Sequence, residues 1–270
     1  INTTKQVLGF SRYLFNTTDF NFVPILMTWL LFIFGAMVAG FVQGLTGFAF
    51  ALIAMSFWVW VLAPQLAAPL LVFASVWSHV ISLSQEQTQP FLSRQLVLPY
   101  LMAGLIGVPL GTYLLQIIQA DTFKMVLGFF LVLWCPVMLL SPQLKMIQHS
   151  GKLADSGIGF MGGILGGLGG FCGAIPSAWV MLKQIPKAQQ RYILRHFNFA
   201  IQLFTLGTYL WQGLINQSHL PYMALLIVFV SLPAILGAKL FYKISELLFK
   251  RIILSLLFST GCFLLASQFI

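Results

Sequence analysis

Four long stretches of this chain contain no charged side chain, and this feature constrains the fold more than any other. No Asp, Glu, Lys or Arg occurs between Asp19 and Glu86, Arg94 and Asp121, Asp155 and Lys183, or Arg195 and Lys239. A bilayer requires about 20 consecutive apolar residues for each spanning helix. Charged residues make up only 7 % of the chain, whereas a soluble domain carries about a quarter. The sequence therefore predicts an all-α polytopic membrane protein.

Short polar stretches divide the chain into two similar halves. Residues 1–22 are polar to amphipathic, which predicts an interfacial N-terminal segment, and residues 141–155 form a polar linker. The ten apolar segments are 23–43, 47–63, 65–84, 95–118, 122–140, 156–168, 171–183, 188–212, 220–243 and 249–269. We therefore expect a first transmembrane repeat over 23–140 and a second over 156–270. Segments 156–168 and 171–183 are short enough for half-helices, and it stays open whether 47–63 and 171–183 cross the whole bilayer.

The second half repeats the first, which indicates a tandem duplication. A shift of 123 positions, from Gly40 to Gly163, superimposes one glycine-rich motif on another. The same shift matches Gly44, Gly47, Phe48 and Ala51 with Gly167, Gly170, Phe171 and Ala174. Two proline positions also match in the same order, Pro64 with Pro186 and Pro99 with Pro221. Chance similarity between apolar helices does not produce so many matched positions in one order.

The basic residues predict that the two repeats have opposite orientations. With ten spans and an outer N-terminus, eleven of the fourteen Lys and Arg residues fall on the inner side, as the positive-inside rule requires. Treating the second and seventh segments as re-entrant places at best nine inside and five outside. We therefore predict an inverted five-plus-five arrangement. Its cytoplasmic loops would be 84–95, 141–155, 184–191 and 244–249.

The duplicated motif combines glycines at short spacing with a proline, as in Gly163, Gly167, Gly170 and Pro176. Such glycines let two backbones approach closely, and a single copy would favour helix packing alone. Glycine and proline also weaken a helix and free backbone polar groups. Interrupted apolar segments at matching positions of two halves point to the binding site of a transporter. We therefore predict helix breaks at both motifs, where Gly47 and Gly170 would let an anion contact bare backbone.

Charge and cysteine content exclude several other classes of protein. The net charge is +9, but the basic residues lie in short loops between apolar spans, so we expect no nucleic-acid partner. Cys135, Cys172 and Cys262 lie in apolar segments without metal-ligand spacing, and no metal or cofactor is expected. The sequence contains no metalloprotease, serine hydrolase or P-loop signature. We therefore do not expect an enzyme. The remaining enzymatic alternative is an intramembrane site that pairs His79 with His196.

Few ionisable side chains lie within apolar segments, so each is a candidate for function. Arg191 and Arg195 are one turn apart on the same helix face. An anchoring role at the cytoplasmic end suits Arg191. Arg195 and His196 lie deeper, and both anchoring and a functional role stay open for them. His79 has three serines nearby in the sequence, which favours a hydrogen-bonded interior histidine.

The ordered set of motifs resembles the TauE/SafE family of membrane permeases. The resemblance rests on the doubled glycine-rich motif, the proline-led helix after it, and the run Leu-Gly-Ala-Lys-Leu-Phe-Tyr-Lys-Ile-Ser at 236–245. It covers nearly the whole chain, from about residue 30 to residue 265. The resemblance implies export or uptake of small sulfur-containing anions such as sulfite and organosulfonates. The first motif departs from the pattern, with Gln43-Gly-Leu-Thr46-Gly-Phe48 in place of a denser glycine run.

These observations predict a membrane permease or exporter for a small anion, and the resemblance narrows the substrate to sulfite or an organosulfonate. The residues expected to bind it are Gln43, Thr46, Gly47, Phe48, Gly169, Gly170, Phe171, Cys172, Arg195, His196 and Asn198. An uncoupled anion channel is the main alternative. Membrane lipid is a further expected partner, while a homo-oligomer and a coupling ion (proton or sodium) stay open. We expect an integral protein of the bacterial cytoplasmic membrane.

Overall fold

The computed structural model describes residues 22–84, 94–140, 151–183, 187–240 and 246–266. These residues form helices joined by short connections, and no β-strand occurs among them. The all-α class predicted from the sequence is confirmed. Nearly all of the expected interfacial segment, most of the expected loops 84–95 and 141–155, and a smaller part of the expected loops 184–191 and 244–249 lie outside the described residues.

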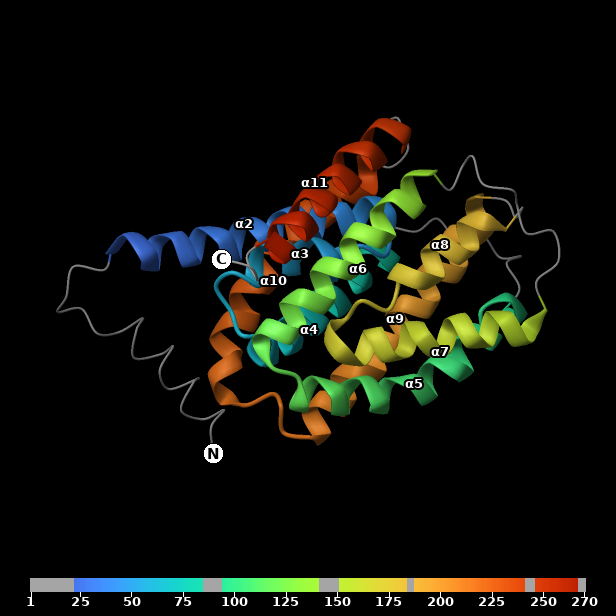
Figure 1. Ribbon diagram of the computed structural model, residues 1–270, viewed down its shortest axis with the longest axis horizontal. Helices are drawn as coiled ribbons and strands as arrows, with labels where there is room; N and C mark the ends of the chain where they lie inside the picture. Colours follow the sequence, from blue (N-terminus) through green and yellow to red (C-terminus); the bar gives the residue numbers. More distant parts are fainter. Residues whose placement is uncertain (1–21, 85–93, 141–150, 184–186, 241–245, 267–270) are drawn as a thin grey trace.

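Each half of the chain contributes five α-helices to the described structure (Figure 1). The first half contains α2 (Phe22–Thr46), α3 (Phe50–Trp58), α4 (Pro64–Ser84), the 3-10 turn η1 (Arg94–Leu96), α5 (Leu98–Ile117) and α6 (Ala120–Leu140). The second half contains α7 (Lys152–Gly169), α8 (Ala174–Leu182), α9 (Lys187–Trp211), the 3-10 turn η3 (Gln217–His219), α10 (Leu220–Leu240) and α11 (Glu246–Ala266).

The helices follow the expected apolar segments, with two clear differences. α3 covers only Phe50–Trp58 of the expected segment 47–63, and α7 is longer than expected. This helix begins at Lys152, inside the expected polar linker, and has 18 residues. Asp155 lies in its first turn, where a negative charge is favourable next to the positive end of the helix. The possibility, left open by the sequence, that 156–168 forms a half-helix is therefore not realised, because the helix extends over polar residues that an apolar pattern does not include.

Among the described residues, five helices are long and apolar enough to cross a membrane. The qualifying stretches are Leu26–Thr46, Pro64–Ser84, Leu98–Ile117, Ala120–Val137 and Gln217–Leu240. By contrast, α3 and α8 have nine residues each, which is about 13 Å at 1.5 Å per residue. Because the apolar core of a bilayer is about 30 Å thick, neither helix is long enough to cross it. Length and composition therefore support an integral membrane protein without establishing ten spans.

Close helix pairs join the two halves. α5 packs along α7, α2 along α10, α6 along α11, and α4 against α9. Glycines allow the first two pairs to approach closely. A Cβ on Gly163 would overlap the carbonyl oxygen of Gly104, and a Cβ on Gly44 would overlap that of Ala234. Most glycines of the duplicated motif therefore serve helix packing, apart from the last one in each copy.

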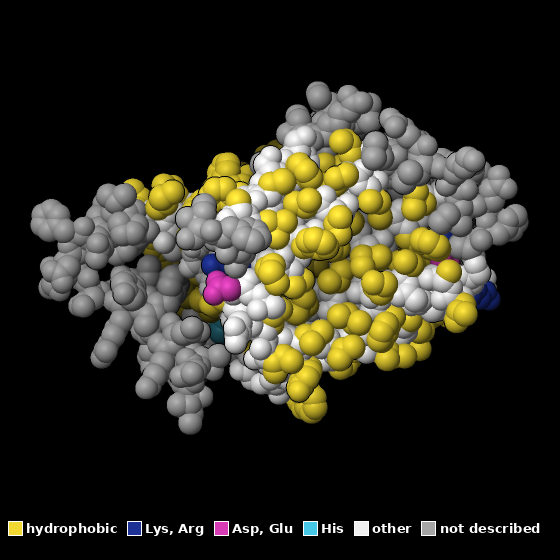
Figure 2. Space-filling view, viewed as in Figure 1, with side chains coloured by type: hydrophobic (Ala, Val, Ile, Leu, Met, Phe, Trp, Pro, Cys, Tyr) yellow, Lys and Arg dark blue, Asp and Glu magenta, His cyan; other side chains and the backbone are white. Residues whose placement is uncertain are grey.

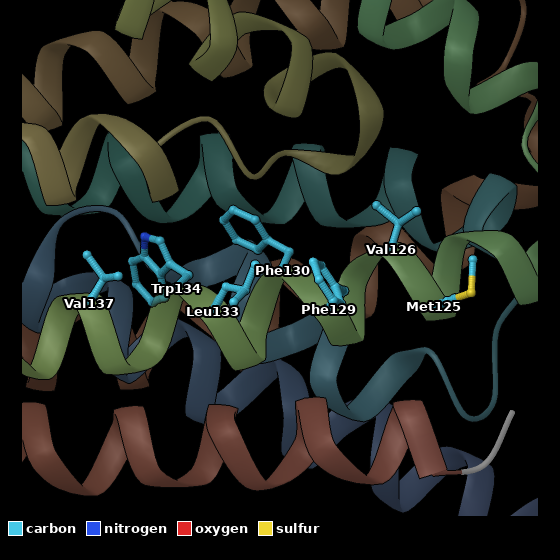
Figure 3. Close-up of a pocket in the computed structure, with 7 residues that line it drawn as sticks. All are labelled: Met125, Val126, Phe129, Phe130, Leu133, Trp134 and Val137. Carbon is cyan, nitrogen blue, oxygen red and sulfur yellow. The ribbon is translucent and has the colours of Figure 1, made fainter. Parts of the chain in front are cut away.

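The outer face of the bundle is apolar, as a lipid-facing surface requires. Figure 2 shows apolar side chains spread over the visible face, with few charged groups among the described residues. Along α6 a groove is lined by Met125, Val126, Phe129, Phe130, Leu133, Trp134 and Val137 (Figure 3). The indole N–H of Trp134 donates to the Ala174 carbonyl oxygen at 2.8 Å. The groove therefore suits lipid chains and provides no evident site for an anion.

Candidate functional site at two helix breaks

The first helix break separates α2 from α3. Gly47 has a φ of 81°, a left-handed conformation that glycine adopts without strain. Its N–H donates to the Gln43 carbonyl oxygen at 2.7 Å, which closes α2. The Gln43 side chain is fully buried, and its Oε1 accepts a hydrogen bond from Phe50 N–H at 3.0 Å. A side chain of α2 therefore caps the N-terminus of α3 and satisfies one of the N–H groups that have no partner within that helix.

The second break separates α7 from α8. Gly170 has a φ of 78° and ends α7, with its N–H bonded to the Gly166 carbonyl oxygen at 2.7 Å. Under the shift of 123 positions, Gly166 occupies the place of Gln43, so α8 has no matching glutamine. Its N-cap residue is Gly173, which has no side chain to cap the helix. The amide of Asn198 lies beside it, because a Cβ on Gly173 would be 2.7 Å from Asn198 Nδ2.

Three buried side chains from different helices connect the two breaks. Gln43 Nε2 donates to Ser75 Oγ of α4 at 3.4 Å, and Ser75 Oγ donates to Gln202 Oε1 of α9 at 2.5 Å. Gln202 Nε2 then donates to the Gly170 carbonyl oxygen at 3.1 Å. Together with the Phe50 bond, these contacts form one hydrogen-bond chain from the start of α3 to the end of α7. The two breaks therefore meet inside the bundle.

The interface between α4 and α9 is polar and antiparallel. Ser75 bonds Gln202, and further along α4 Ser82 bonds Arg195, so residue numbers rise on one helix as they fall on the other. Arg195 Nη2 donates to both the carbonyl and the hydroxyl oxygen of Ser82, to the hydroxyl at 2.6 Å. Arg195 is 2 % exposed, and a cation is favoured at this C-terminal end of α4. A side chain so enclosed does not extend to lipid head groups, which disfavours the anchoring alternative.

Most of the residues expected from the sequence lie at the two breaks. Gln43, Gly47 and Phe48 lie at the first break, and Gly169, Gly170, Phe171, Cys172 and Asn198 lie at the second. The half-buried Thr46 donates its hydroxyl to the Val42 carbonyl oxygen within α2, at 2.9 Å. His196 is also half-buried, with Nδ1 at 2.9 Å from the Tyr192 carbonyl oxygen. The Arg191 side chain is not among those described.

The sequence prediction omitted two members of the connecting chain, Ser75 and Gln202. A signal for them existed, because Ser75, Ser78 and Ser82 recur at helical spacing along α4, as Asn198 and Gln202 do along α9. Polar side chains at such spacing in an apolar helix mark the face that turns to the bundle interior. The sequence does not show, however, which polar face meets which.

A separate polar cluster lies where α5, α7 and α8 meet. Lys183 Nζ is 2.5 Å and 2.7 Å from the two carboxylate oxygens of Asp155. The Tyr100 hydroxyl and the Trp179 indole each donate to the same carboxylate at 2.8 Å. Because Asp155 lies at the start of α7 and Lys183 directly follows α8, this ion pair closes the open end of a helical hairpin.

Apolar helices of membrane-spanning length, two half-length helices and two breaks that meet among buried polar side chains define a helical integral membrane protein with interrupted helices. Interrupted helices of this kind are typical of secondary transporters.

The family model of the sulfite exporter TauE/SafE matches residues 32–264. The chain belongs to this family, so the resemblance inferred from the motifs is confirmed. It is a family of transporters, which is consistent with a role other than catalysis. No similar curated protein and no similar solved structure was found.

Proposed function

We propose that the protein exports sulfite, or another small sulfur-containing anion such as an organosulfonate, across the bacterial cytoplasmic membrane. Family membership supports the class of substrate. The structural observation that carries the proposal is the hydrogen-bond chain between the two helix breaks. It is built from amides and hydroxyls that can donate to the oxygen atoms of an anion when the two breaks move apart.

Both breaks favour an anion for electrostatic reasons. The N-terminus of a helix carries a partial positive charge, and both α3 and α8 begin at a break. The C-terminal ends of α2 and α7 lie at the same breaks, but their last N–H groups are bonded within the turns at Gly47 and Gly170, so the donors available to an anion belong to the short helices and to the neighbouring side chains. Gly47 and Gly170 have no side chain to keep an anion from the backbone N–H groups. Thr46 and Cys172 would line the two sides, and Asn198 would donate from α9. Arg195 and His196, on the same helix, would attract the anion toward the breaks.

The contacts between matching helices support two inverted repeats of five segments each. α4 and α9 hold the same place in their halves, and the Ser75–Gln202 and Ser82–Arg195 bonds make them antiparallel. Parallel repeats, related by an axis along the membrane normal, would place matching helices in the same direction. An axis in the membrane plane inverts them. The antiparallel contact therefore favours two inverted repeats, each with five segments.

A flux assay with purified protein in proteoliposomes tests the proposal. We expect saturable flux of radiolabelled sulfite or an organosulfonate that is accelerated by unlabelled substrate on the opposite side, with little flux of acetate. Flux that neither saturates nor shows counter-transport would favour an uncoupled anion channel instead. Imposed proton and sodium gradients would identify the coupling ion. Absence of flux for every sulfur-containing anion would contradict the proposed function.

A further inference from the structure

The antiparallel interface between α4 and α9 contains two hydrogen-bonded pairs of side chains, and a further set of polar side chains, here called the middle level, lies between them. Ser75 with Gln202 forms one bonded level, and Ser82 with Arg195 forms the other. The antiparallel register therefore places Ser78 and His79 of α4 opposite Asn198 of α9.

This middle level differs from its neighbours in its hydrogen bonding. Ser78 Oγ, both ring nitrogens of His79 and both amide atoms of Asn198 are buried and, among the described residues, have no hydrogen-bond partner. The expectation that His79 is hydrogen-bonded to a neighbouring serine is therefore wrong, although the histidine is interior as expected. Ser78 and His79 are 0 % exposed and Asn198 is 1 % exposed. Polar groups left unpaired within a bilayer are costly, because lipid offers no substitute partner. Several such atoms at one level therefore indicate a site that a polar ligand completes.

The middle level also faces the second helix break. A Cβ on Gly173 would lie 2.7 Å from Nδ2 and 2.9 Å from Oδ1 of Asn198. Gly173 is the N-cap of α8, a helix of nine residues. At the first break the buried Gln43 side chain already accepts from the start of α3. The start of α8 lacks that glutamine, and its Ala174 N–H donates instead to the Phe171 carbonyl oxygen at 3.1 Å. The unpartnered Asn198 amide lies directly beside Gly173, at the start of this helix.

The surrounding charges favour an anion over a cation at this level. The buried guanidinium of Arg195 lies one turn from Asn198 on α9. The described aspartates are engaged elsewhere, Asp155 with Lys183 at 2.5 Å and Asp121 with Lys124 at 3.8 Å. Hydroxyl, imidazole and amide groups provide the O–H and N–H donors that the oxygen atoms of an oxyanion require.

We infer that Ser78, His79 and Asn198, together with the N-terminus of α8, form the subsite that holds the oxygen atoms of a small sulfur oxyanion. This inference rests on the proposed function and adds Ser78 and His79 to its binding residues. It also places the anion asymmetrically, at the second break rather than midway between the two.

Equilibrium binding of radiolabelled sulfite to the purified protein in detergent tests the subsite. We expect Ser78→Ala to raise the Kd about fivefold, and Asn198→Asp to raise it more than about tenfold because it places a carboxylate beside the anion. Ser177→Ala is the matched control. Ser177 is also a fully buried serine, but its hydroxyl donates to the Ala174 carbonyl oxygen in its own helix at 2.8 Å. We expect it to bind sulfite with wild-type affinity.

Wild-type affinity in Ser78→Ala and Asn198→Asp, with sulfite binding to the unmodified protein intact, would overturn the subsite and leave the proposed function standing. The same holds if the two variants lower only the melting temperature, since the level is then structural. If Asn198→Asp does not fold, Ser78→Ala and His79→Gln decide by the same Kd criterion. If the unmodified protein neither binds nor transports any sulfur-containing anion, the proposed function fails and the subsite fails with it.

Discussion

Ser75 and Gln202, from opposite halves of the chain, share a hydrogen bond of 2.5 Å between α4 and α9. Each of them also bonds a group at a helix break. Ser75 accepts from Gln43 at the first break, and Gln202 donates to Gly170 at the second. One contact between the halves therefore couples both breaks. If the repeats move against each other during transport, we expect this bond to break and re-form in each cycle.

Replacing Gln202 by Leu should remove the link, because the Ser75 hydroxyl loses its acceptor and the buried Gly170 carbonyl oxygen loses its side-chain amide donor. Each unpaired buried group costs about 1–3 kcal/mol of folding free energy, so we expect a lower melting temperature. We also expect sulfite transport to be about tenfold slower, which corresponds to a transport barrier raised by about 1.4 kcal/mol. Thr205→Val is the control, because the buried Thr205 hydroxyl bonds the Ile201 carbonyl oxygen of its own helix. A wild-type transport rate in Gln202→Leu would argue against a role in transport for the hydrogen-bond chain between the two breaks.

Glycines that permit helix packing should differ sharply from a glycine that faces open space. A Cβ on Gly163 would overlap the Gly104 carbonyl oxygen, whereas a Cβ on Gly207 meets nothing within 4 Å. We expect Gly163→Ala to destabilise the protein by about 1–3 kcal/mol through overpacking. Gly207→Ala should be neutral or slightly stabilising, because Ala is the better helix former. Thermal unfolding of the two purified variants gives the comparison, and equal melting temperatures would contradict the close approach of α5 and α7.

The two glycines at the helix breaks, both with left-handed backbone, should separate the effect of backbone strain from that of filling space. Gly47 has open space for a Cβ, so Gly47→Ala adds only backbone strain of about 1–2 kcal/mol. At Gly170 a Cβ would also lie 3.3 Å from Val72 Cγ2. We expect Gly170→Leu to abolish sulfite transport and Gly47→Ala to retain part of it, each measured at equal protein density in proteoliposomes. Transport at the wild-type rate by an inserted Gly170→Leu protein would remove this break from the site.

Removing one partner of the Asp155–Lys183 ion pair should destabilise the protein far more than removing both partners together. Removing one partner of a buried pair typically costs about 3–5 kcal/mol, and the Asp155 carboxylate also serves Tyr100 and Trp179. We expect Asp155→Ala to lower the melting temperature strongly. The double variant with Lys183→Met should recover part of the loss.

The exposed ion pair between Asp121 and Lys124 provides a matched comparison for the buried Asp155–Lys183 pair. Its atoms are 3.8 Å apart and the Asp121 side chain is 82 % exposed, so Asp121→Ala should cost at most about 1 kcal/mol. A melting temperature of Asp155→Ala as high as that of Asp121→Ala would contradict a structural role for the hairpin pair.

The inverted arrangement predicts the side from which the central linker is accessible. A single cysteine at Lys145, in a background without Cys135, Cys172 and Cys262, should react with an impermeant thiol reagent only from the cytoplasmic side. The reason is the excess of basic residues in the loops of that side. Reaction from the outer side of intact cells would contradict the inverted repeats.

Much of the architecture is predictable from local patterns. The charge-free stretches, the duplicated glycine motif and the matched prolines predict the membrane class, the family and both helix breaks. These features are determined locally, because bilayer thickness sets the length of apolar segments and glycine sets where a helix can end in a left-handed turn. The length of α7 was less predictable. Its first turn is polar, and Asp155 is held there by Lys183, which follows in the chain only after α8.

The connection between the breaks depends on tertiary structure alone. The sequence shows that Gln43, Ser75 and Gln202 are polar residues in apolar helices, but not that they form one hydrogen-bond chain. Likewise, Arg195 has the same sequence pattern as an anchoring arginine, and only its burial against Ser82 distinguishes the two roles. The physical reason is that the packing of whole helices determines which of their faces are in contact and in which register. The close glycine contacts between α5 and α7 and between α2 and α10 contribute to that packing. It brings Ser75 and Gln202, which are 127 positions apart, into hydrogen-bond contact.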